Sequence, residues 1–198
     1  MAKAATKTSV PAGYNAVMPY LRVKGAAEAI EFYKAAFGAK ERFRLTMGDR
    51  LGHAEIEIGG AIIMLSDEFP EKNILGPKSL KGTTFALSIY VDDVDALFAK
   101  AVAAGGAAKR PPTDEFYGDR TGQIEDPFGH LWMIQARIED VSPKEMQKRL
   151  DALMAGEPLE PPRIATEKTM RETTSGTKPA AQKSATKKSS PKSGKKKG

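Results

Sequence analysis

One pattern of residues occurs twice in this chain of 198 residues. A β-rich run leads into an amphipathic helical segment that ends at Gly38, and the same order ends again at Gly106, 68 residues later. A Gly-Asp-Arg segment follows in each copy, at residues 48–50 and 118–120, 70 residues apart. Each copy must bury the apolar side of its helix against its own strands. The duplication therefore predicts two copies of one supersecondary unit.

The elements of each copy follow from periodicity. Apolar side chains recur at intervals of three and four in residues 26–40 and 92–106, as on one face of a helix, and Asp92 or Asp93 is placed to cap the second helix. Strand-like runs lie before each helix, at 16–23 and 83–91, and further runs lie after it, among them 53–60 and 61–66 in the first copy and 121–126 and 130–138 in the second. We expect an α+β chain in which two tandem βαβββ modules, about 13–68 and 83–140, form a curved, barrel-like mixed sheet.

Two local motifs complete the folded part. The segment 126–129, Asp-Pro-Phe-Gly, has proline and glycine where a type I turn favours them, and we expect it to join the last two strands. Ser142 followed three residues later by Glu145 is a capping box. It predicts a C-terminal helix over 141–155, after the domain at 13–140.

The positive charge of the chain is concentrated at its end. The formal net charge is +6, but residues 173–198 contain eight lysines and no acidic residue. We therefore expect a mildly acidic folded body, a loose N-terminus at 1–12, and a disordered linker and Lys-rich tail at 156–198. The tail either serves solubility or makes weak, non-specific contacts to nucleic-acid phosphates. The lysines for such polyanion binding are Lys187, Lys188, Lys192, Lys195, Lys196 and Lys197.

Composition excludes several kinds of site. The chain has no cysteine and only two histidines, His53 and His130, so thiolate chemistry and a three-histidine zinc site are both excluded within one chain. No apolar run approaches the roughly 18 residues of a membrane-spanning helix. No secretory signal pattern is present at the N-terminus. We expect a cytoplasmic protein with no membrane partner.

Together these features resemble the vicinal oxygen chelate superfamily, which includes glyoxalase I, bleomycin-resistance proteins and extradiol dioxygenases. The resemblance is carried by segments 20–23, 91–94 and 126–130, and the segments 53–55, 64–67 and 117–120 are most similar to its PhnB-like branch. It implies paired βαβββ modules and a homodimer. It also implies a divalent metal held by two side chains of each module.

The metal positions implied by the resemblance lack suitable ligands. They fall at or near Met18, Met64, Ala86 and Met133. Divalent metals of this kind need imidazole or carboxylate there. We therefore expect no metal and no other cofactor, although a remote site that combines His53 and Glu55 with Glu125 or Asp119 stays open as an alternative.

The same positions indicate an organic ligand. If they face inward, strand alternation makes their neighbours inward as well, and the set is apolar and aromatic with a few polar groups, which is typical of a small-molecule pocket. The alternative is that these side chains simply fill the sheet. The predicted ligand-binding residues are Tyr20, Arg22, Met64, Ser88, Tyr90, Tyr117, Asp119, Arg120, Met133 and Gln135.

Catalysis is the second hypothesis. His53, Glu55 and Glu57 alternate with apolar residues, so His53 is placed to act as a general base oriented by Glu55, or the strand simply shows its polar side to solvent. Arg50 and Arg120 of the two Gly-Asp-Arg segments are placed either to bind an anion or to form loop-bracing ion pairs with their aspartates. Binding of a small organic molecule without metal is the leading hypothesis. A lyase, isomerase or dioxygenase of the same fold, and a nucleic-acid-associated protein, are the alternatives.

Overall fold

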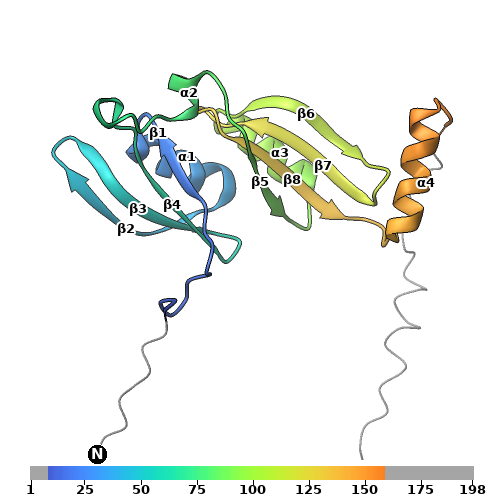
Figure 1. Cartoon of the computed structure of the whole chain (residues 1–198), viewed down its shortest axis with the longest axis horizontal. Helices are drawn as coiled ribbons and strands as arrows, with labels where there is room; N and C mark the ends of the chain where they lie inside the picture. Colours follow the sequence, from blue (N-terminus) through green and yellow to red (C-terminus); the bar gives the residue numbers. More distant parts are fainter. Residues whose placement is uncertain (1–8, 159–198) are drawn as a thin grey trace, which may run out of the picture. The chain divides into compact units, whose positions relative to one another are not determined.

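A computed structural model describes residues 9–158. The first module contains β1 (Tyr20–Val23), α1 (Ala26–Phe37), β2 (Lys40–Met47), β3 (Arg50–Ile58) and β4 (Ala61–Asp67). The second contains β5 (Ala86–Tyr90), α3 (Val94–Ala103), β6 (Ala107–Asp114), β7 (Asp119–Glu125) and β8 (Leu131–Arg137). A short 3₁₀ helix, η1 (Pro70–Lys72), and α2 (Pro77–Leu80) lie between the modules, and α4 (Pro143–Met154) follows them (Figure 1). The predicted α+β fold with a duplicated βαβββ unit and a C-terminal helix is confirmed.

The strands form two four-stranded sheets with the same topology. Their orders are β1-β4-β3-β2 and β5-β8-β7-β6. The pairs β1–β4 and β5–β8 are parallel, and the other neighbouring strands are antiparallel. The register pairs Tyr20 with Met64 in the first sheet and Ser88 with Met133 in the second. Each module therefore builds a sheet of its own. The sequence predicted one mixed sheet, whereas the structure has two, each with parallel and antiparallel pairs.

The register also shows which residues of the two copies correspond. Glu55 pairs with Met64 in the first sheet, whereas Gln123 pairs with Met133 in the second. Gln123 therefore corresponds to Glu55, and Glu125 lies two residues further along its strand. Sequence matching at the Gly-Asp-Arg segments misses this difference because the turn between β2 and β3 is shorter than the turn between β6 and β7.

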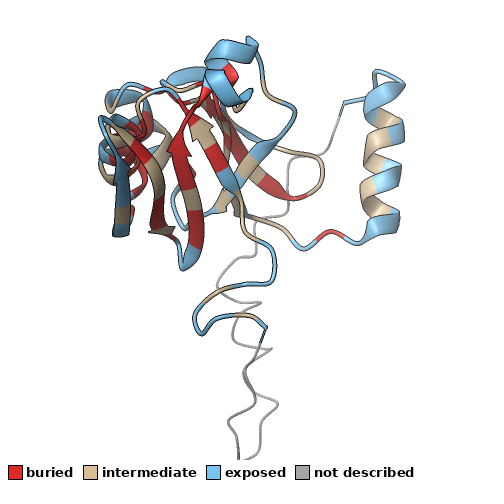
Figure 2. Ribbon diagram, turned by 60° about the vertical axis from the view of Figure 1, so that its left-hand side comes forward, coloured by how far each residue is buried: buried red, intermediate tan, exposed pale blue. Residues whose placement is uncertain are grey.

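One face of each sheet packs against the helices, and α1 and α3 contact each other. The helix-facing residues of both modules belong to one apolar core, which joins Leu21, Ile56 and Leu65 to Ile124 and Ile134. Figure 2 shows buried residues in the strands and α1, whereas α4 has none. The strand alternation predicted from the sequence is confirmed on this side of the sheets.

Aromatic rings and one carboxylate hold the modules together. The Trp132 ring lies 5.4 Å from Tyr33 and 4.4 Å from Phe37, measured between ring centroids. Asp126, which is buried, accepts hydrogen bonds from the Tyr33 hydroxyl at 2.8 Å and from the Trp132 indole at 3.0 Å. The predicted turn at 126–129 is present, closed by a 3.0 Å hydrogen bond from the Gly129 amide to the Asp126 carbonyl.

The helix ends follow the capping rules in different ways. Gly38 ends α1 with φ 69°, which a residue with a side chain rarely adopts. Asp93 caps α3 by accepting from the Ala96 amide at 2.9 Å, and Ser142 caps α4. The start of α1 uses a distant residue, because Asp67 at the end of β4 accepts from the Gly25 and Ala26 amides at 2.9 and 2.8 Å.

The predictions for the linker and the Lys-rich tail fall mainly on residues 159–198, which lie outside the described residues, as does the N-terminal segment 1–8. Within residues 9–158 no helix is long and apolar enough to cross a membrane.

Candidate functional site

The face of the first sheet that points away from α1 carries a cluster of polar and aromatic side chains. Strand alternation turns Ala54 and Ile56 toward the helix, and it turns His53 and Glu55 to the opposite side. Cross-strand pairing then sets these two residues beside side chains from β1, β2 and β4. We call this surface the first face; its residues are Tyr20, Arg22, Phe43, Leu45, His53, Glu55, Met64 and Ser66.

Glu55 is the buried centre of the first face. Its residue exposure is 2%, so it is not part of a simple solvent-exposed strand face. The Tyr14 hydroxyl donates to its two carboxylate oxygens at 3.0 and 2.8 Å, and the Arg42 guanidinium lies 3.2 Å from one of them. A buried carboxylate needs such partners, because an unpaired charge in the interior is strongly destabilising.

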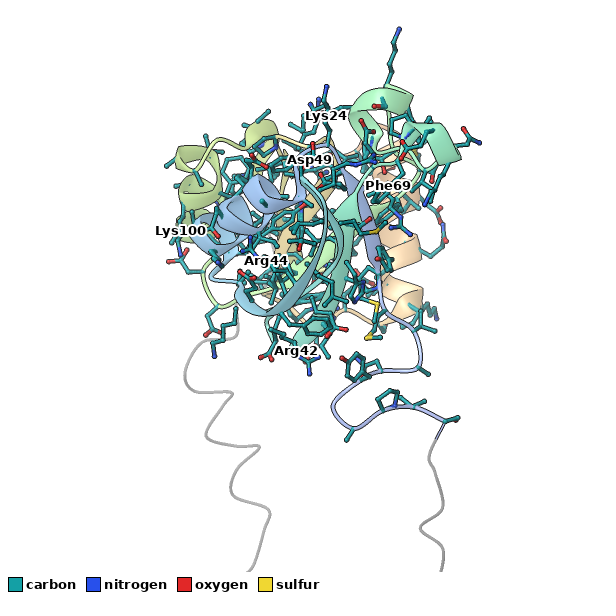
Figure 3. The ribbon with its side chains drawn as sticks, turned by 90° about the vertical axis from the view of Figure 1, so that its left-hand side faces the viewer. Lys24, Arg42, Arg44, Asp49, Phe69 and Lys100 are labelled. Atoms are coloured by element: carbon teal, nitrogen blue, oxygen red, sulfur yellow. The ribbon has the colours of Figure 1, made fainter. Side chains whose placement is uncertain are left out.

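Arg42 reaches Glu55 because of a β-bulge. The pairing of β2 with β3 shifts between Glu41 and Phe43, which leaves Arg42 as the extra residue. A bulge re-aims a side chain relative to strict alternation. Arg42 therefore turns to Glu55 on the first face, while Arg44 pairs with Glu41; both arginines are labelled in Figure 3.

His53 has a partner near each ring nitrogen. The Tyr20 hydroxyl lies 2.8 Å from Nδ1, and a Glu55 oxygen lies 3.5 Å from Nε2. In one tautomer Nδ1 accepts from Tyr20 and Nε2 carries the proton; the 3.5 Å contact of Nε2 with Glu55 is a charge contact rather than a hydrogen bond. The residues are thus arranged as a chain from Glu55 through His53 to the hydroxyl of Tyr20.

Arg22 adds a positive charge to the same surface. Its guanidinium carbon lies 4.0 Å from the Tyr20 ring centroid in a cation–π contact, and one of its nitrogens donates to the Ser66 hydroxyl. Apolar residues continue the surface along β2, where Phe43 is 40% and Leu45 57% exposed. Among residues 9–158 the helices contact the opposite side of this sheet, so the first face is open.

The corresponding face of the second sheet has a different centre. Asp119 is buried and accepts a 2.9 Å hydrogen bond from the Tyr90 hydroxyl and another from Arg137. Hydrogen bonding of Arg137 to Tyr90, followed by that to Asp119, raises the pKa of the Arg137 guanidinium. Tyr117 lies beside them, with its hydroxyl 3.4 Å from that of Thr121. We call this surface the second face; its residues are Ser88, Tyr90, Asp119, Thr121, Gln123, Met133 and Gln135.

The predicted site residues are therefore distributed over two sheets. Tyr20, Arg22 and Met64 share the first face with His53 and Glu55. Five other predicted ligand-binding residues lie on the second face: Ser88, Tyr90, Asp119, Met133 and Gln135. Tyr117 lies next to them. The structure brings the two groups onto faces of different sheets rather than into one set of contacts.

The two Gly-Asp-Arg arginines are paired, but not with their neighbouring aspartates. Arg120 binds Asp95 and Asp114 with nitrogen–oxygen distances of 2.6 and 2.7 Å. Arg50 binds Glu71 at 2.8 Å. Of the two alternatives for these arginines the structure shows ion pairs, but with more distant carboxylates in place of Asp49 and Asp119.

His130 connects the two modules. Its Nε2 lies 3.2 Å from the carbonyl oxygen of Arg22 in the other module. Burial lowers the pKa of His130, which keeps the ring neutral. The residue therefore joins the modules and is not part of either face.

Sequence reasoning missed Tyr14 and Arg42. Tyr14 precedes the first strand, so no periodicity marks it, and it reaches Glu55 only through the path of the N-terminal segment. Arg42 lies at a bulge, where alternation gives the wrong side. For Arg42 the one available signal was that a charged residue stands at an irregular position of an edge strand.

The side chains at the implied metal positions do not fit a divalent ion. None of the four residues is an imidazole or carboxylate: Met18, Met64, Ala86 and Met133. The cross-strand partners of Met64 and Met133, which are Tyr20 and Ser88, supply none either. Within the described part of the chain no group of three or more histidine, cysteine or acidic side chains is placed to hold one ion. The alternative ligand Glu125 is bound instead by Lys78 and Lys109.

The chain was compared with known proteins. The sequence model of the glyoxalase/bleomycin resistance protein/dioxygenase superfamily matches residues 13–134. An uncharacterised protein of Mycobacterium bovis is 38% identical over 141 residues, which are 69% of this chain and 93% of that protein.

Solved structures agree with the sequence match. The structure of an Arabidopsis thaliana gene product has a TM-score of 0.52 and 27% identity, and the match covers 61% of this chain and 98% of the other. A PhnB protein of Bacillus cereus has the same fold at 18% identity, with a TM-score of 0.51 and coverage of 62% and 99%. The chain belongs to the glyoxalase/bleomycin resistance protein/dioxygenase superfamily.

Proposed function

We propose that the chain binds a small organic molecule on the first face, without a metal ion. The observation that carries this proposal is the buried carboxylate of Glu55, held by Tyr14 and Arg42 beneath an open surface. A buried ionic network adds little net stability compared with apolar packing, so its presence favours a role in binding.

The chemistry of the first face specifies a class of ligand. The Tyr20 ring, stacked with the Arg22 guanidinium, offers a flat surface for an aromatic group. Arg22 has further N–H donors besides the one directed to Ser66, and these suit a carboxylate. The exposed Phe43 and Leu45 add apolar area beside them. The ligand of this proposal is therefore an aromatic carboxylate.

A second copy of the chain completes the site in this proposal. The open rim of the first face exposes Phe43, Leu45 and Met47 at 40, 57 and 54%. A contiguous apolar surface of this kind is typical of an interaction site, and like chains associate most often in symmetric pairs. A homodimer would exclude water from the ligand and strengthen its polar contacts.

Equilibrium dialysis with 2-naphthoate tests the binding proposal. We expect saturable binding, weakened about tenfold or more by Tyr20→Ala and by Arg22→Gln. The matched control is Tyr90→Ala on the second face, which should leave the affinity within about twofold. Equal losses in all three variants, or no saturable binding by the unaltered chain, would contradict the proposal.

A second candidate function, proton-transfer catalysis, is favoured by the chain from Glu55 through His53 to Tyr20. A proton taken from a ligand by the Tyr20 oxygen would pass to His53 Nδ1, and the carboxylate of Glu55 would stabilise the resulting imidazolium. Such a relay suits removal of an acidic C–H proton next to a carbonyl.

Exchange of carbon-bound hydrogen tests this candidate. In deuterium oxide we expect the unaltered chain to exchange the methylene protons of phenylacetone faster than buffer does, as followed by NMR. His53→Gln should lower the added rate by about 10²- to 10⁴-fold. Equal rates for the variant and the unaltered chain would exclude this relay, and 2-naphthoate binding would still test the first proposal separately.

A further inference from the structure

A cavity away from the first face is lined by charged side chains that are mainly positive. The segment that joins the modules lines it with α2 and residues 81–83, together with residues near the start of β6, the end of β7 and the start of β8. A cavity of about 380 Å³ remains between them. We call it the lysine pocket; its charged residues are Lys78, Lys81, Lys109 and Glu125, and its apolar walls are Pro77 and Leu131.

The charges of the lysine pocket do not balance. Glu125 bridges two of the ammonium groups, with distances of 2.8 Å to Lys78 and 3.1 Å to Lys109. These two contacts lower the pKa of the Glu125 carboxyl, which keeps it ionised. Among the described residues Lys81 has neither an ion-pair nor a hydrogen-bond partner for its side chain. Three ammonium groups and one carboxylate leave an excess of two positive charges.

The backbone of Lys81 supports a role for its side chain. Its φ is 59°, in the left-handed region, at the position that ends α2. Glycine or asparagine is usual there, because other side chains are disfavoured in this conformation. Strained residues of this kind concentrate at functional sites. Lys81 therefore combines a disfavoured backbone conformation with a side chain that lines the cavity.

We propose that the lysine pocket binds a small organic phosphate monoester, at a site separate from the first face. At neutral pH such a group carries a charge of about −1.5 to −2, which matches the excess of two positive charges. Lysine ammonium groups bind phosphate as point charges, and Lys81 and Lys109 supply them here. Pro77 and Leu131 form an apolar wall for the organic part, and the cavity falls in the size range of about 300–1,000 Å³ that is typical of small-molecule sites.

Calorimetric titration of the full chain with phenyl phosphate tests the proposal. We expect saturable binding that Lys81→Asn weakens about tenfold, since one charged contact is lost. Asparagine tolerates the left-handed conformation, so this variant should keep or raise the melting temperature. Lys109→Gln should weaken binding by a similar factor.

Lys100→Gln is the matched control. Lys100 is an exposed lysine of α3, labelled in Figure 3 on the helix layer and away from α2. We expect this control to leave the affinity unchanged. Equal weakening by Lys100→Gln and Lys81→Asn would overturn the proposal, because it would assign binding to diffuse charge rather than to the pocket.

Two further titrations test the class of ligand. Phenol lacks the charge and should not bind, while inorganic phosphate lacks the apolar part and should bind more weakly than phenyl phosphate. Inorganic phosphate that binds as tightly as phenyl phosphate would overturn the assignment to a monoester. No binding of phenyl phosphate at millimolar concentration would overturn the site itself. Neither result bears on 2-naphthoate binding, which depends on Tyr20 and Arg22.

Discussion

The two modules have the same strand order, and they differ in what each sheet presents on the side away from its helix. On the first face the buried Glu55 is surrounded by Tyr14, Arg42 and His53. At the matching position of the second sheet the register places Gln123. The buried carboxylate of the second face is Asp119, the first residue of β7, and it is held by Tyr90 and Arg137.

This difference follows from what each side of a sheet must do. The helix-facing residues of both modules share one core, so their size and apolar character are fixed by packing. Within the described residues the opposite faces are not constrained by a helix in the same way, and their side chains can diverge without loss of the fold. The two modules thus share a strand order and a core, while the faces away from the helices carry different side chains.

The largest expected effect concerns the turn before the last strand of each module, where the copies differ most. The first module uses a two-residue turn at 59–60, whereas the second uses Asp126 and three following residues. Asp126→Ala would leave the Tyr33 hydroxyl, the Trp132 indole and two backbone amides without their buried acceptor. We expect a loss of about 3–5 kcal/mol in the free energy of unfolding, measured with urea.

Two variants sharpen this measurement. Tyr33→Phe removes only one donor and should cost about 1 kcal/mol. Asp140→Ala changes a side chain that is 100% exposed and should stay within about 0.5 kcal/mol of the unaltered chain. A loss for Asp126→Ala no larger than that for Tyr33→Phe would show that the turn does not hold the second module to α1.

The next largest effect compares how the two helices begin. Asp67 caps α1 from β4 and also accepts from the Leu51 amide at 2.6 Å, whereas Asp93 caps α3 from its own first turn. We expect Asp67→Ala to cost about 2–3 kcal/mol, because three amides lose a buried acceptor, and Asp93→Ala about 1 kcal/mol. Urea denaturation of both variants measures the difference. Equal costs would mean that the long-range cap adds nothing to a local one.

These caps show why some of the fold was predictable from the sequence. Local patterns indicate the helix boundaries, the Gly38 end and the caps by Asp93 and Ser142, because these depend on neighbours within a few residues. The reciprocal half of the expected capping box is replaced, since the Glu145 carboxylate bonds to Arg149. The cap of α1 by Asp67 spans about 40 residues of chain, and no local pattern predicts it. The division into two sheets likewise depends on contacts between distant strands.

The candidate site follows the same rule. Alternation along β3 correctly placed His53 and Glu55 on one face, but only the register of the sheet shows that Tyr20 and Met64 lie beside them. It could not show that Glu55 is buried, because burial is produced by Tyr14 from outside the strands and by Arg42 at a bulge. Irregular positions of this kind carry no periodic signal.

A smaller effect concerns the ion pairs that link each helix to its sheet. In the first module Glu41 of β2 pairs with Arg44 and with Lys34 of α1; in the second, Asp95 of α3 pairs with Arg120 of β7. Arg44, followed by Lys34, holds the pKa of Glu41 at about 2, below its ordinary value of 4.5. Because this folded-state pKa is depressed, the stabilisation is present above about pH 4.5 and is lost as the pH falls toward 2.

We expect Glu41→Gln to lower the free energy of unfolding by about 1 kcal/mol near neutral pH, after allowance for solvent screening. The difference in unfolding free energy from the unaltered chain should shrink as the pH falls below 4.5. Unfolding free energies measured with urea across this pH range test it. Glu157→Gln, which changes an exposed carboxylate, is the control. A difference between Glu41→Gln and the unaltered chain that stays constant with pH would contradict the assignment.

The smallest effect concerns the twin arginines, which the repeat made look equivalent. Arg50 of β3 pairs with Glu71 of η1, and its guanidinium lies 4.4 Å from the centroid of the Phe69 ring; the side chains of Arg50 and Glu71 are 39 and 51% exposed. Arg120 pairs with both Asp95 and Asp114 and so connects α3 to two strands. We expect Arg50→Gln to cost at most about 0.5 kcal/mol and Arg120→Gln about 1 kcal/mol, measured with urea at low and high salt. Since exposed ion pairs are screened by salt, both costs should fall as salt is added. A larger cost for Arg50→Gln would mean that one ion pair in the first module does more than the two that join helix and sheet in the second.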